Sequence, residues 1–179
     1  MLSLVLSIAF YARAQENDLG YTKVSTLKEI NYFYDLEHIK LAKSSSNLNL
    51  DQIQKLTFTS NKRLLKSEKG GCYWYSITIN NDTKSSKTYY IYTANNDYVW
   101  LFKNQASHFK VLGTAGNYVT TPNLQIKNIA YYLKFNIAPA ERLNLLIKVF
   151  NKRKVAPDLN LSLETENVYH QEVLKTYQE

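Results

Sequence analysis

Apolar and polar residues alternate with a period of two along several stretches of this chain, which is the pattern of half-buried β-strands. The clearest stretch is residues 73–80, and it is followed by a polar run, 80–86, that is rich in turn-forming residues. Its two faces are Tyr73, Tyr75, Ile77 and Ile79 on one side and Trp74, Ser76, Thr78 and Asn80 on the other. The pattern resumes at 87–93, which predicts a neighbouring antiparallel strand, and a third strand is expected at 98–102.

The second half of the chain follows the same pattern. Pro139-Ala140-Glu141 is predicted to form a turn between strands at 130–137 and 143–150, and another strand is expected at 159–164. The predicted inward residues are Tyr131, Leu133, Phe135 and Ile137, then Leu143, Leu145, Ile147 and Val149, then Leu159, Leu161 and Leu163. Strands separated by polar turns in place of helices predict an all-β, antiparallel, jelly-roll-like β-sandwich and argue against a parallel α/β fold.

Two segments depart from the strand pattern. Residues 47–56 have apolar positions near helical spacing, so they are expected to form a short helix or a loop that caps the sandwich. In residues 165–179, Tyr169, Val173 and Tyr177 recur at every fourth position, which is a helical stripe. An isolated helix of this length is marginally stable in water, so we expect it to pack on the domain or to continue further.

The N-terminal residues have the anatomy of a secretory signal peptide. An apolar run at 2–11 is followed by Ala12-Arg13-Ala14, the small-residue pattern that signal peptidase recognises. The run is about half of the ~20 residues that a membrane-spanning helix needs. We therefore expect a signal peptide at 1–14, a sandwich domain at 15–164 and a helical linker at 165–179; the alternative is a buried first strand or helix of a cytoplasmic domain.

Charge and cysteine content restrict the partners. The formal net charge is +7, but Lys and Arg are scattered, and Lys152-Arg153-Lys154 is the one tight cluster. This distribution predicts a soluble surface and no nucleic-acid partner. Cys72 is the single cysteine, so the chain has no intrachain disulfide and no paired-cysteine metal site.

Motifs for catalysis, metals and cofactors are missing from the sequence. It contains no Gly-rich phosphate loop, no His-x-x-x-His spacing and no Gly-x-Ser-x-Gly elbow, so we expect neither an enzyme nor a cofactor. A glycosidase would require two carboxylates from predicted turns, such as Asp97, Glu141 or Asp158, to meet in space. Asn81-Asp82-Thr83 matches a glycosylation sequon, although turn formation is the preferred interpretation.

Aromatic residues supply the main chemical signal. Outward positions of the predicted strands carry Tyr90, Tyr92 and Trp100, which we expect to form an aromatic platform. Tyr118 and Lys127, on the segment after Gly113, are expected to reach over its edge with polar groups. Flat rings with polar tips suit a carbohydrate or another small polar ligand. The alternative is that both faces of these strands are buried, and Trp74 in particular has the character of a core residue.

Several short aromatic segments resemble those of a known family. They are 73–80 with its polar turn, 99–102, 113–122, 132–137 and 145–149, with Asn31-Tyr32-Phe33-Tyr34-Asp35 upstream. Over residues 23–165 the chain resembles the type 2 extracellular module of bacterial seven-transmembrane receptors with diverse intracellular signalling modules. The resemblance implies a jelly-roll-like periplasmic sandwich that binds carbohydrates or related small ligands. It also implies that 165–179 is a juxtamembrane linker and that the parent chain continues into membrane helices and a cytoplasmic output domain.

One position departs from the family pattern. Many members carry an Arg soon after the Pro of this region, whereas the first cation after Pro122 is Lys127, a point charge without the planar donor fork of Arg. The sequence thus predicts an exported sensor module of a membrane receptor at the periplasmic face of a bacterial inner membrane. The alternative is a non-catalytic protein–protein interaction or dimerisation sandwich, in which exposed aromatic residues pack on a partner or on a second copy.

Overall fold

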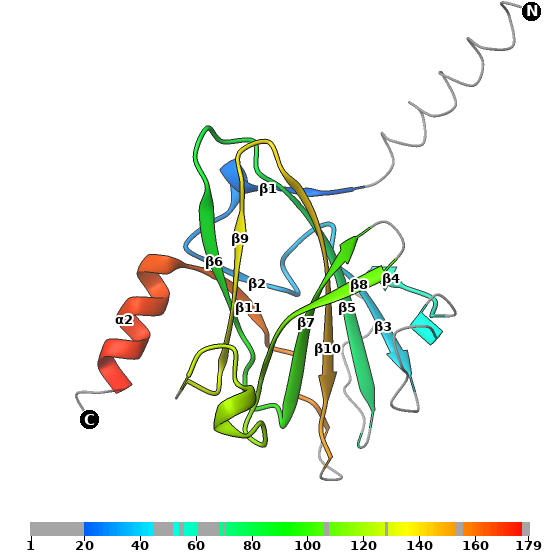
Figure 1. The fold of residues 1–179 in the computed structure, drawn as a ribbon. Coiled ribbons are helices and arrows are strands. Elements are labelled where there is room, and N and C mark those ends of the chain that lie inside the picture. Colours follow the sequence, from blue (N-terminus) through cyan, green and yellow to red (C-terminus); the bar gives the residue numbers. More distant parts are fainter. Residues whose placement is uncertain are drawn as a thin grey trace, which may run out of the picture.

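Two β-sheets pack face to face in this protein, and a C-terminal helix lies on the outside of one of them (Figure 1). The computed structural model describes residues 20–44, 52–53, 56–60, 69, 71–105, 108–127, 129–152 and 156–176. Sheet A contains β1 (Thr22–Lys23), β3 (Lys40–Ser44), β4 (Thr59–Ser60), β5 (Cys72–Asn80), β7 (Tyr98–Gln105), β8 (His108–Ala115) and β10 (Arg142–Phe150). Sheet B contains β2 (Ile30–Tyr32), β6 (Lys87–Tyr92), β9 (Tyr132–Ile137) and β11 (Ser162–Thr165). The remaining elements are the 3-10 turns η1 (Val24–Thr26) and η4 (Thr121–Asn123) and the helix α2 (Glu166–Thr176).

The strand order makes both sheets essentially antiparallel. Sheet A runs β4-β3-β5-β10-β7-β8, with β1 added parallel to one end of β5, and sheet B runs β2-β11-β6-β9. The prediction of an all-β sandwich is therefore confirmed. The signal peptide predicted at 1–14 lies outside the described residues, as does most of the segment 47–56.

The predicted alternation identifies the core between the sheets. On β5 and β10 the inward residues are buried, and Ile77 lies directly opposite Leu145 across the two strands. On β9, Leu133, Phe135 and Ile137 are buried as predicted. Tyr131 is an exception, because it precedes β9 and is 42% exposed.

The predicted pairing of 73–80 with 87–93 is wrong. These segments form β5 and β6, which belong to different sheets: β5 pairs with β3 and β10, while β6 pairs with β9 and β11. The connection between β9 and β10 changes sheets in the same way. Alternation identifies a strand and its faces, but it does not identify the strand's partners, so these crossings were not visible in the sequence.

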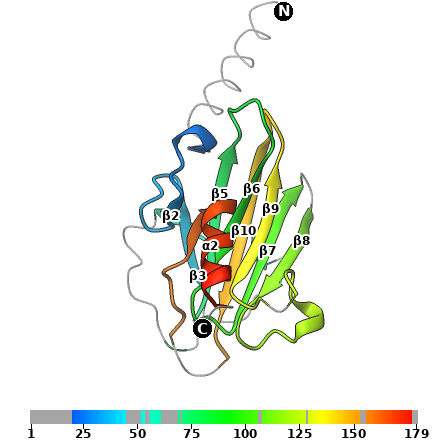
Figure 2. The ribbon, with the colours of Figure 1, turned by 90° about the vertical axis from the view of Figure 1, so that its left-hand side faces the viewer.

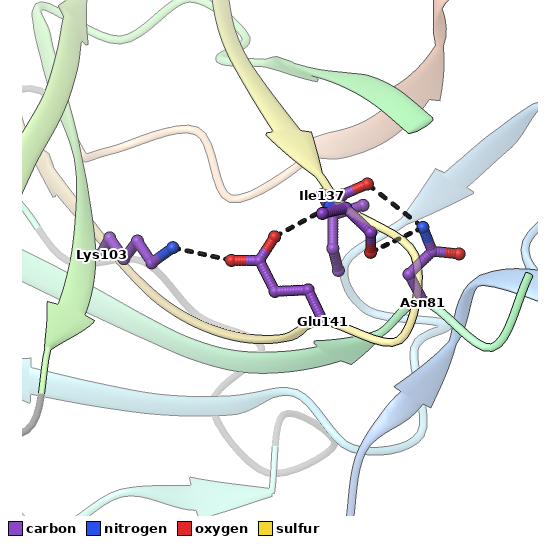
Figure 3. Close-up of polar contacts among 5 residues, drawn as sticks. Asn81, Lys103, Ile137 and Glu141 are labelled. Carbon is purple, nitrogen blue, oxygen red and sulfur yellow. Dashed lines mark hydrogen bonds and ion pairs between the residues drawn. The ribbon is translucent and has the colours of Figure 1, made fainter. Parts of the chain in front are cut away.

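Asn81 ties the two crossings together (Figure 3). Its side chain is fully buried, and Nδ2 donates to the backbone oxygens of Ile137 (3.1 Å), Ala138 (2.9 Å) and Ser85 (2.9 Å). Its Oδ1 accepts from the backbone N–H and the hydroxyl of Thr83. These contacts confirm the turn role that was preferred over glycosylation for this position.

Glu141, on the connection between β9 and β10, stabilises the same end of the sandwich. Its Oε1 lies 2.7 Å from Lys103 Nζ, and its Oε2 accepts from the Ala138 N–H at 2.8 Å (Figure 3). The hydrogen bond from Lys103, supported by the one from Ala138, lowers the pKa of Glu141. The end of the sandwich where both chain crossings lie is thus fixed by hydrogen bonds from side chains to backbone and by one ion pair.

Strand β8 was not predicted. A register irregularity between Leu101 and Phe102 opposes Leu101 to Gly113 but Phe102 to Val111, so Leu112 has no direct partner on β7. An extra residue of this kind breaks the period of two on the bulged strand. The alternation that identified the other strands is therefore interrupted in β8.

The C-terminal helical stripe packs back on the domain. Helix α2 begins at Glu166, directly after β11, and lies against the outer face of sheet B (Figure 2). Tyr169 and Val173 contact sheet B as the stripe predicts, and Tyr177 lies outside the described residues. In the part of the chain that the structure describes, no helix has the length and apolar character to cross a membrane.

We expect truncation of the core to be costly. Ile77 and Leu145 are each 2% exposed, so Ile77→Ala and Leu145→Ala should each lower the free energy of unfolding by about 2–5 kcal/mol. Denaturant titration measures the change. Val111→Ala on β8, where the side chain is 52% exposed, is the control and should shift stability by less than about 0.5 kcal/mol. Core variants as stable as this control would show that the two strand faces are inverted.

The hydrogen bonds of the Asn81 side chain yield a second prediction. Asn81→Ala removes the donor for three backbone carbonyls, and a buried acceptor left without a partner costs about 1–3 kcal/mol, so we expect a loss of about 3 kcal/mol. Asn136→Ala is the matched control, because Asn136 is exposed and its side-chain oxygen accepts from the Thr88 hydroxyl at 3.1 Å. If both variants unfold at the same denaturant concentration, Asn81 does not hold the crossings together.

Candidate functional site

The outer face of sheet A carries a lysine between two tryptophans. Lys148 on β10 lies opposite Trp74 of β5 on one side and opposite Trp100 of β7 on the other. Its Nζ is 5.0 Å from the ring centroid of Trp74 and 4.9 Å from that of Trp100. Cation–π attraction to both rings stabilises the ammonium at this position.

Further aromatic rings extend this surface toward one end of the strands. Tyr98 stacks on Trp100, with 5.7 Å between ring centroids, and on Phe150 at 6.4 Å. Tyr118, on the loop after β8, approaches Tyr98 at 6.4 Å. We refer to Tyr98, Trp100, Tyr118 and Phe150 as the aromatic strip. Tyr118 is exposed and the other three are half-buried, so part of each ring of the strip is open to solvent.

A cavity of about 260 Å³ lies toward the other end of the same face. Residues from the β3–β5 connection, among them Phe58, and strand residues such as Phe109 and Leu146 form its apolar part. Ser76, Asn104 and Asn144 supply a hydroxyl and two amides. The Thr78 hydroxyl donates to Asn144 Oδ1 at 2.8 Å, which leaves the Asn144 amide N–H groups as donors. The cavity therefore combines hydrogen-bonding groups with apolar walls.

Lys148 is almost buried, at 8% exposure. Burial lowers its pKa, and the neighbouring Cys72 acts in the opposite direction. Burial also raises the pKa of the Cys72 thiol, although Lys148 lowers it in part. The two groups lie beside Trp74 in an apolar cluster. The ammonium is therefore a positive charge that is buried just beneath the outer surface of sheet A.

The structure does not bring the five predicted site residues together. Trp100 and Tyr118 lie on the sheet A side, whereas Tyr90 and Tyr92 are on β6 and face outward from sheet B. Lys127 is exposed, between Ile126 and Ile129, which pack against the cluster of Tyr90. The single platform is therefore incorrect, because β6 and β7 belong to different sheets of the sandwich. Ligand binding by these side chains stays a prediction.

Tyr90 and Tyr92 belong instead to the contact between sheet B and α2. The rings of Tyr90 and Tyr169 are parallel within 4°, with centroids 3.8 Å apart, and Tyr132 meets Tyr169 edge-on at 5.0 Å. Tyr92 is half-buried beside Tyr132. For Tyr90, burial beneath another element is thus the correct interpretation, and the stack fixes α2 on the sheet.

A buried carboxyl group lies beside this tyrosine cluster. Glu164 is 6% exposed and accepts hydrogen bonds from the Ser162 hydroxyl at 2.7 Å and the Tyr132 hydroxyl at 3.1 Å. Burial raises its pKa, the two hydrogen bonds oppose the shift, and Glu172 on α2 adds to it. Docking of α2 therefore involves a carboxyl group for which ionisation is unfavourable.

Sequence reasoning missed Lys148, Tyr98 and Phe150 as surface residues of sheet A. A signal for two of them was present, because the alternation along residues 143–150 already places Lys148 and Phe150 on the face opposite the core. The pairing of β10 with both β5 and β7 was needed to join them to Trp74 and Trp100.

Two of the turn carboxylates are far from one another. Asp97 precedes β7, where its backbone N–H donates to Asn151 and its carboxylate accepts from the Lys152 N–H. Glu141 lies at the opposite end of the β7–β10 pair, bound to Lys103. Among the described residues, no group of three or more His, Cys, Asp or Glu side chains is arranged to hold a metal ion.

The fold and this outer face define a class, a β-sandwich domain with an aromatic surface on one sheet and a docked helix on the other. The family model for the 7TMR-DISM extracellular 2 domain matches residues 31–162, and the chain belongs to this family. The family forms the extracellular part of membrane receptors that carry downstream signalling modules, so this domain functions outside the cytoplasm as a receptor module. The resemblance seen in the sequence is confirmed.

Solved structures show weaker likeness. A GH31 alpha-xylosidase from Xanthomonas citri is 11% identical with a TM-score of 0.35, and the match covers 80% of this chain and 14% of that enzyme. A glycoside hydrolase family 43 arabinoxylan arabinofuranohydrolase from Bacillus subtilis, solved in complex with cellotetraose, is 12% identical with a TM-score of 0.28, over 81% of this chain and 27% of that one. TM-scores below 0.5 say nothing about function. No curated protein matches the chain.

The raised pKa of Glu164 predicts a pH-dependent stability. A group whose pKa is higher in the folded state stabilises the fold below its ordinary value of 4.5, and that contribution is lost as pH rises through the raised pKa. Glu164→Gln should therefore have a higher thermal midpoint than the parent at pH 7, and the difference should shrink as the pH falls below 4.5.

The control for this prediction is Glu37→Gln, which removes the same charge from a side chain that is 87% exposed. The thermal midpoint of this control should equal that of the parent at every pH. A Glu164→Gln midpoint below that of the parent at pH 7 would mean that ionised Glu164 stabilises the contact with α2.

Proposed function

We propose that this domain is the ligand-binding sensor of a membrane receptor at the periplasmic face of a bacterial inner membrane, and that it binds a carbohydrate or another small polar ligand. The binding surface is the outer face of sheet A. One observation carries the proposal: a single sheet face combines the aromatic strip with the cavity lined by Ser76, Asn104 and Asn144. Ring faces cover the C–H surface of a sugar, while amides and hydroxyls bond its hydroxyl groups.

The position of the surface on paired strands supports this role. Trp100 and Tyr98 are on β7, Phe150 is on the adjacent β10, and mutual stacking restrains the three rings. Groups held on rigid elements are better preorganised than groups on loops, so less side-chain entropy is lost when a ligand binds.

We propose that the domain acts by binding alone. Of the three carboxylates considered for hydrolysis, Asp97 and Glu141 hold structural contacts at opposite ends of sheet A, and Asp158 Oδ1 accepts from the Asn160 N–H. Glu141 contacts Lys103 and the Ala138 N–H, and Asp97 accepts from the Lys152 N–H. Asp97 lies next to Tyr98 of the aromatic strip, but its carboxylate is held by the Lys152 N–H.

Signalling requires that the ligand favour one state of the receptor over another. Helix α2 directly follows β11 and rests on the outer face of sheet B, on the opposite side of the sandwich from the proposed binding surface. In this proposal residues 165–179 connect the sandwich to membrane helices and a cytoplasmic output domain. The contact of Tyr169 with Tyr90 and Tyr132 is then the point at which the sandwich controls the linker.

A second candidate function is a protein–protein interaction or dimerisation module. Ile30, Tyr32 and Tyr34 are exposed on and just after the edge strand β2, and the rings of Tyr32 and Tyr34 stack at 5.2 Å. Size-exclusion chromatography of the chain without ligand separates the two functions. A stable dimer that Tyr32→Ala dissociates would favour the interaction module.

The test of the sensor proposal is truncation of the aromatic strip. Against a panel of neutral and acidic oligosaccharides, calorimetry should find at least one ligand for the parent, and Trp100→Ala should bind it about tenfold or more weakly, the loss of roughly 1.4 kcal/mol or more that a central aromatic contact supplies. Tyr131→Ala removes an exposed ring outside the strip and should bind like the parent.

Thermal midpoints distinguish lost binding from lost folding. Should Trp100→Ala unfold early, Tyr118→Ala replaces it, because Tyr118 is 40% exposed and lies at the rim of the strip. A parent that binds no saccharide or other small polar ligand contradicts the proposed function. If both strip variants bind the ligand as tightly as the parent does, the binding site lies elsewhere.

A further inference from the structure

A further cavity lies apart from the proposed binding surface, near the start of the described chain. Its volume is about 380 Å³, and its walls come from residues 21–31, which include η1, and from residues 35–38 between β2 and β3. Both segments are drawn in blue in Figure 1. Among the residues that the structure describes, none belongs both to these walls and to the aromatic strip or the cavity beside Asn104. A cavity of this size is large enough for a small molecule.

Part of the wall of this cavity is apolar. Leu27 and Leu36 are half-buried and pack against the core between the sheets, and Ile30 adds an exposed aliphatic side chain. The Tyr21 ring also lines the cavity, and the Arg142 guanidinium lies over that ring at 4.9 Å from its centroid. An aliphatic group that leaves water for these walls gains free energy. The cavity therefore favours a ligand with an apolar side chain.

Charged side chains of both signs line the same cavity, from different segments. Lys28 belongs to the first segment and Asp35 to the second, and both are exposed. Lys23 and Glu37 add a further charge of each sign, and Glu37 lies 3.9 Å from His38 Nε2. Within the described part of the chain, the side chains of Lys28 and Asp35 form no ion pair with one another. A ligand that carries both charges would therefore find a partner for each of them.

Hydrogen bonds fix the backbone from which both charges extend. The Asn31 side chain accepts from the Lys28 N–H at 2.9 Å, and it donates to the carbonyls of Lys28 at 2.7 Å and Leu163 at 3.3 Å. In the second segment, the Asp35 N–H donates to the Tyr32 carbonyl at 3.0 Å. The two charged residues are thus held at set positions before a ligand arrives, which reduces the entropy lost on binding.

The same cavity lies beside the start of α2. The backbone carbonyl of Glu29, next to Lys28 in the chain, accepts from the Thr165 N–H at 2.9 Å. Thr165 is the last residue of β11, and α2 begins at Glu166. A ligand bound by Lys28 would therefore lie next to the junction between the sandwich and the helix.

We propose that this cavity binds a free amino acid with an aliphatic side chain. The carboxylate of the ligand lies toward Lys28, its ammonium lies toward Asp35, and its side chain packs against Leu27 and Leu36. A neutral molecule would use neither charge, and an ion of one sign would be attracted by one wall and repelled by the other. A small zwitterion with an apolar side chain uses all three features of the cavity. The site is separate from the proposed saccharide surface, and this inference does not depend on that function.

The test compares an amino acid with analogues that each change one feature. For L-leucine, 4-methylpentanoate lacks the ammonium group, 3-methylbutylamine lacks the carboxylate, and leucyl-leucine is the dipeptide; L-isoleucine and L-valine are titrated with their own analogues. Calorimetry with the parent chain should find at least one of the three amino acids bound. That amino acid should bind about tenfold or more tightly than each of its analogues, because the single-charge analogues lose a charge-assisted contact and the dipeptide separates its two charges.

Two variants then assign the contacts. Lys28→Gln should weaken binding of the amino acid about tenfold or more without weakening binding of the carboxylate-free analogue. Asp35→Asn should weaken binding of the amino acid by a similar factor without weakening binding of the ammonium-free analogue. Both side chains are exposed, so both variants should keep the thermal midpoint of the parent. Lys84→Gln is the matched control, because Lys84 is exposed on the connection between β5 and β6, and it should bind the amino acid like the parent.

Each other outcome overturns the inference. A parent chain that binds none of the three amino acids has no such site, and this result leaves the saccharide proposal intact. An analogue with one charge that binds as tightly as the amino acid shows that the zwitterion is not recognised. Tighter binding of the dipeptide identifies a peptide as the ligand instead. If Lys28→Gln and Asp35→Asn both bind the amino acid as tightly as the parent does, the amino acid binds outside this cavity.

Discussion

Asn81 holds together the two places where the chain passes from one sheet to the other. The connections from β5 to β6 and from β9 to β10 meet at one end of the sandwich, and the buried Asn81 amide bonds the carbonyls of both. Glu141 and Lys103 brace the same end. Because these crossings assign β5 and β10 to sheet A and β6 and β9 to sheet B, they decide which aromatic side chains share a surface. The position of the candidate site on sheet A and the docking of α2 on sheet B both depend on this end of the sandwich. So does their location on opposite outer faces.

The two outer faces that result differ in chemistry. Sheet A presents Trp100 and its neighbours around the Lys148 ammonium, and its strands lack acidic residues. Sheet B presents Tyr90 and Tyr132, which are covered by Tyr169 of α2 above the buried Glu164. In the proposed function, one face binds the ligand and the other holds the segment that follows the sandwich. A receptor module needs both properties, and the rigid core of Ile77, Leu145 and their neighbours lies between them.

Much of the fold could be predicted because alternation is a local property. Burial of Ile77, Ile79, Leu145 and Val149 follows from the period of two, and the helical stripe of α2 follows from the spacing of Tyr169 and Val173. Strand β8 escaped because its irregular register interrupts the alternation. The candidate site was predicted only in part: Trp100 and Tyr118 lie on the sheet A side, while Tyr90, Tyr92 and Lys127 lie on the sheet B side.

The sequence by itself determined the all-β class, the inward and outward faces of most strands, the family and the positive charge of the chain. These depend on residue type and on spacing within one segment. Only the tertiary structure decided that β10 lies between β5 and β7, which places Lys148 between Trp74 and Trp100. It also decided that Tyr90 lies beneath α2. Strand partners are chosen by packing between segments far apart in the chain, and the period of an isolated strand is the same whichever partner it has.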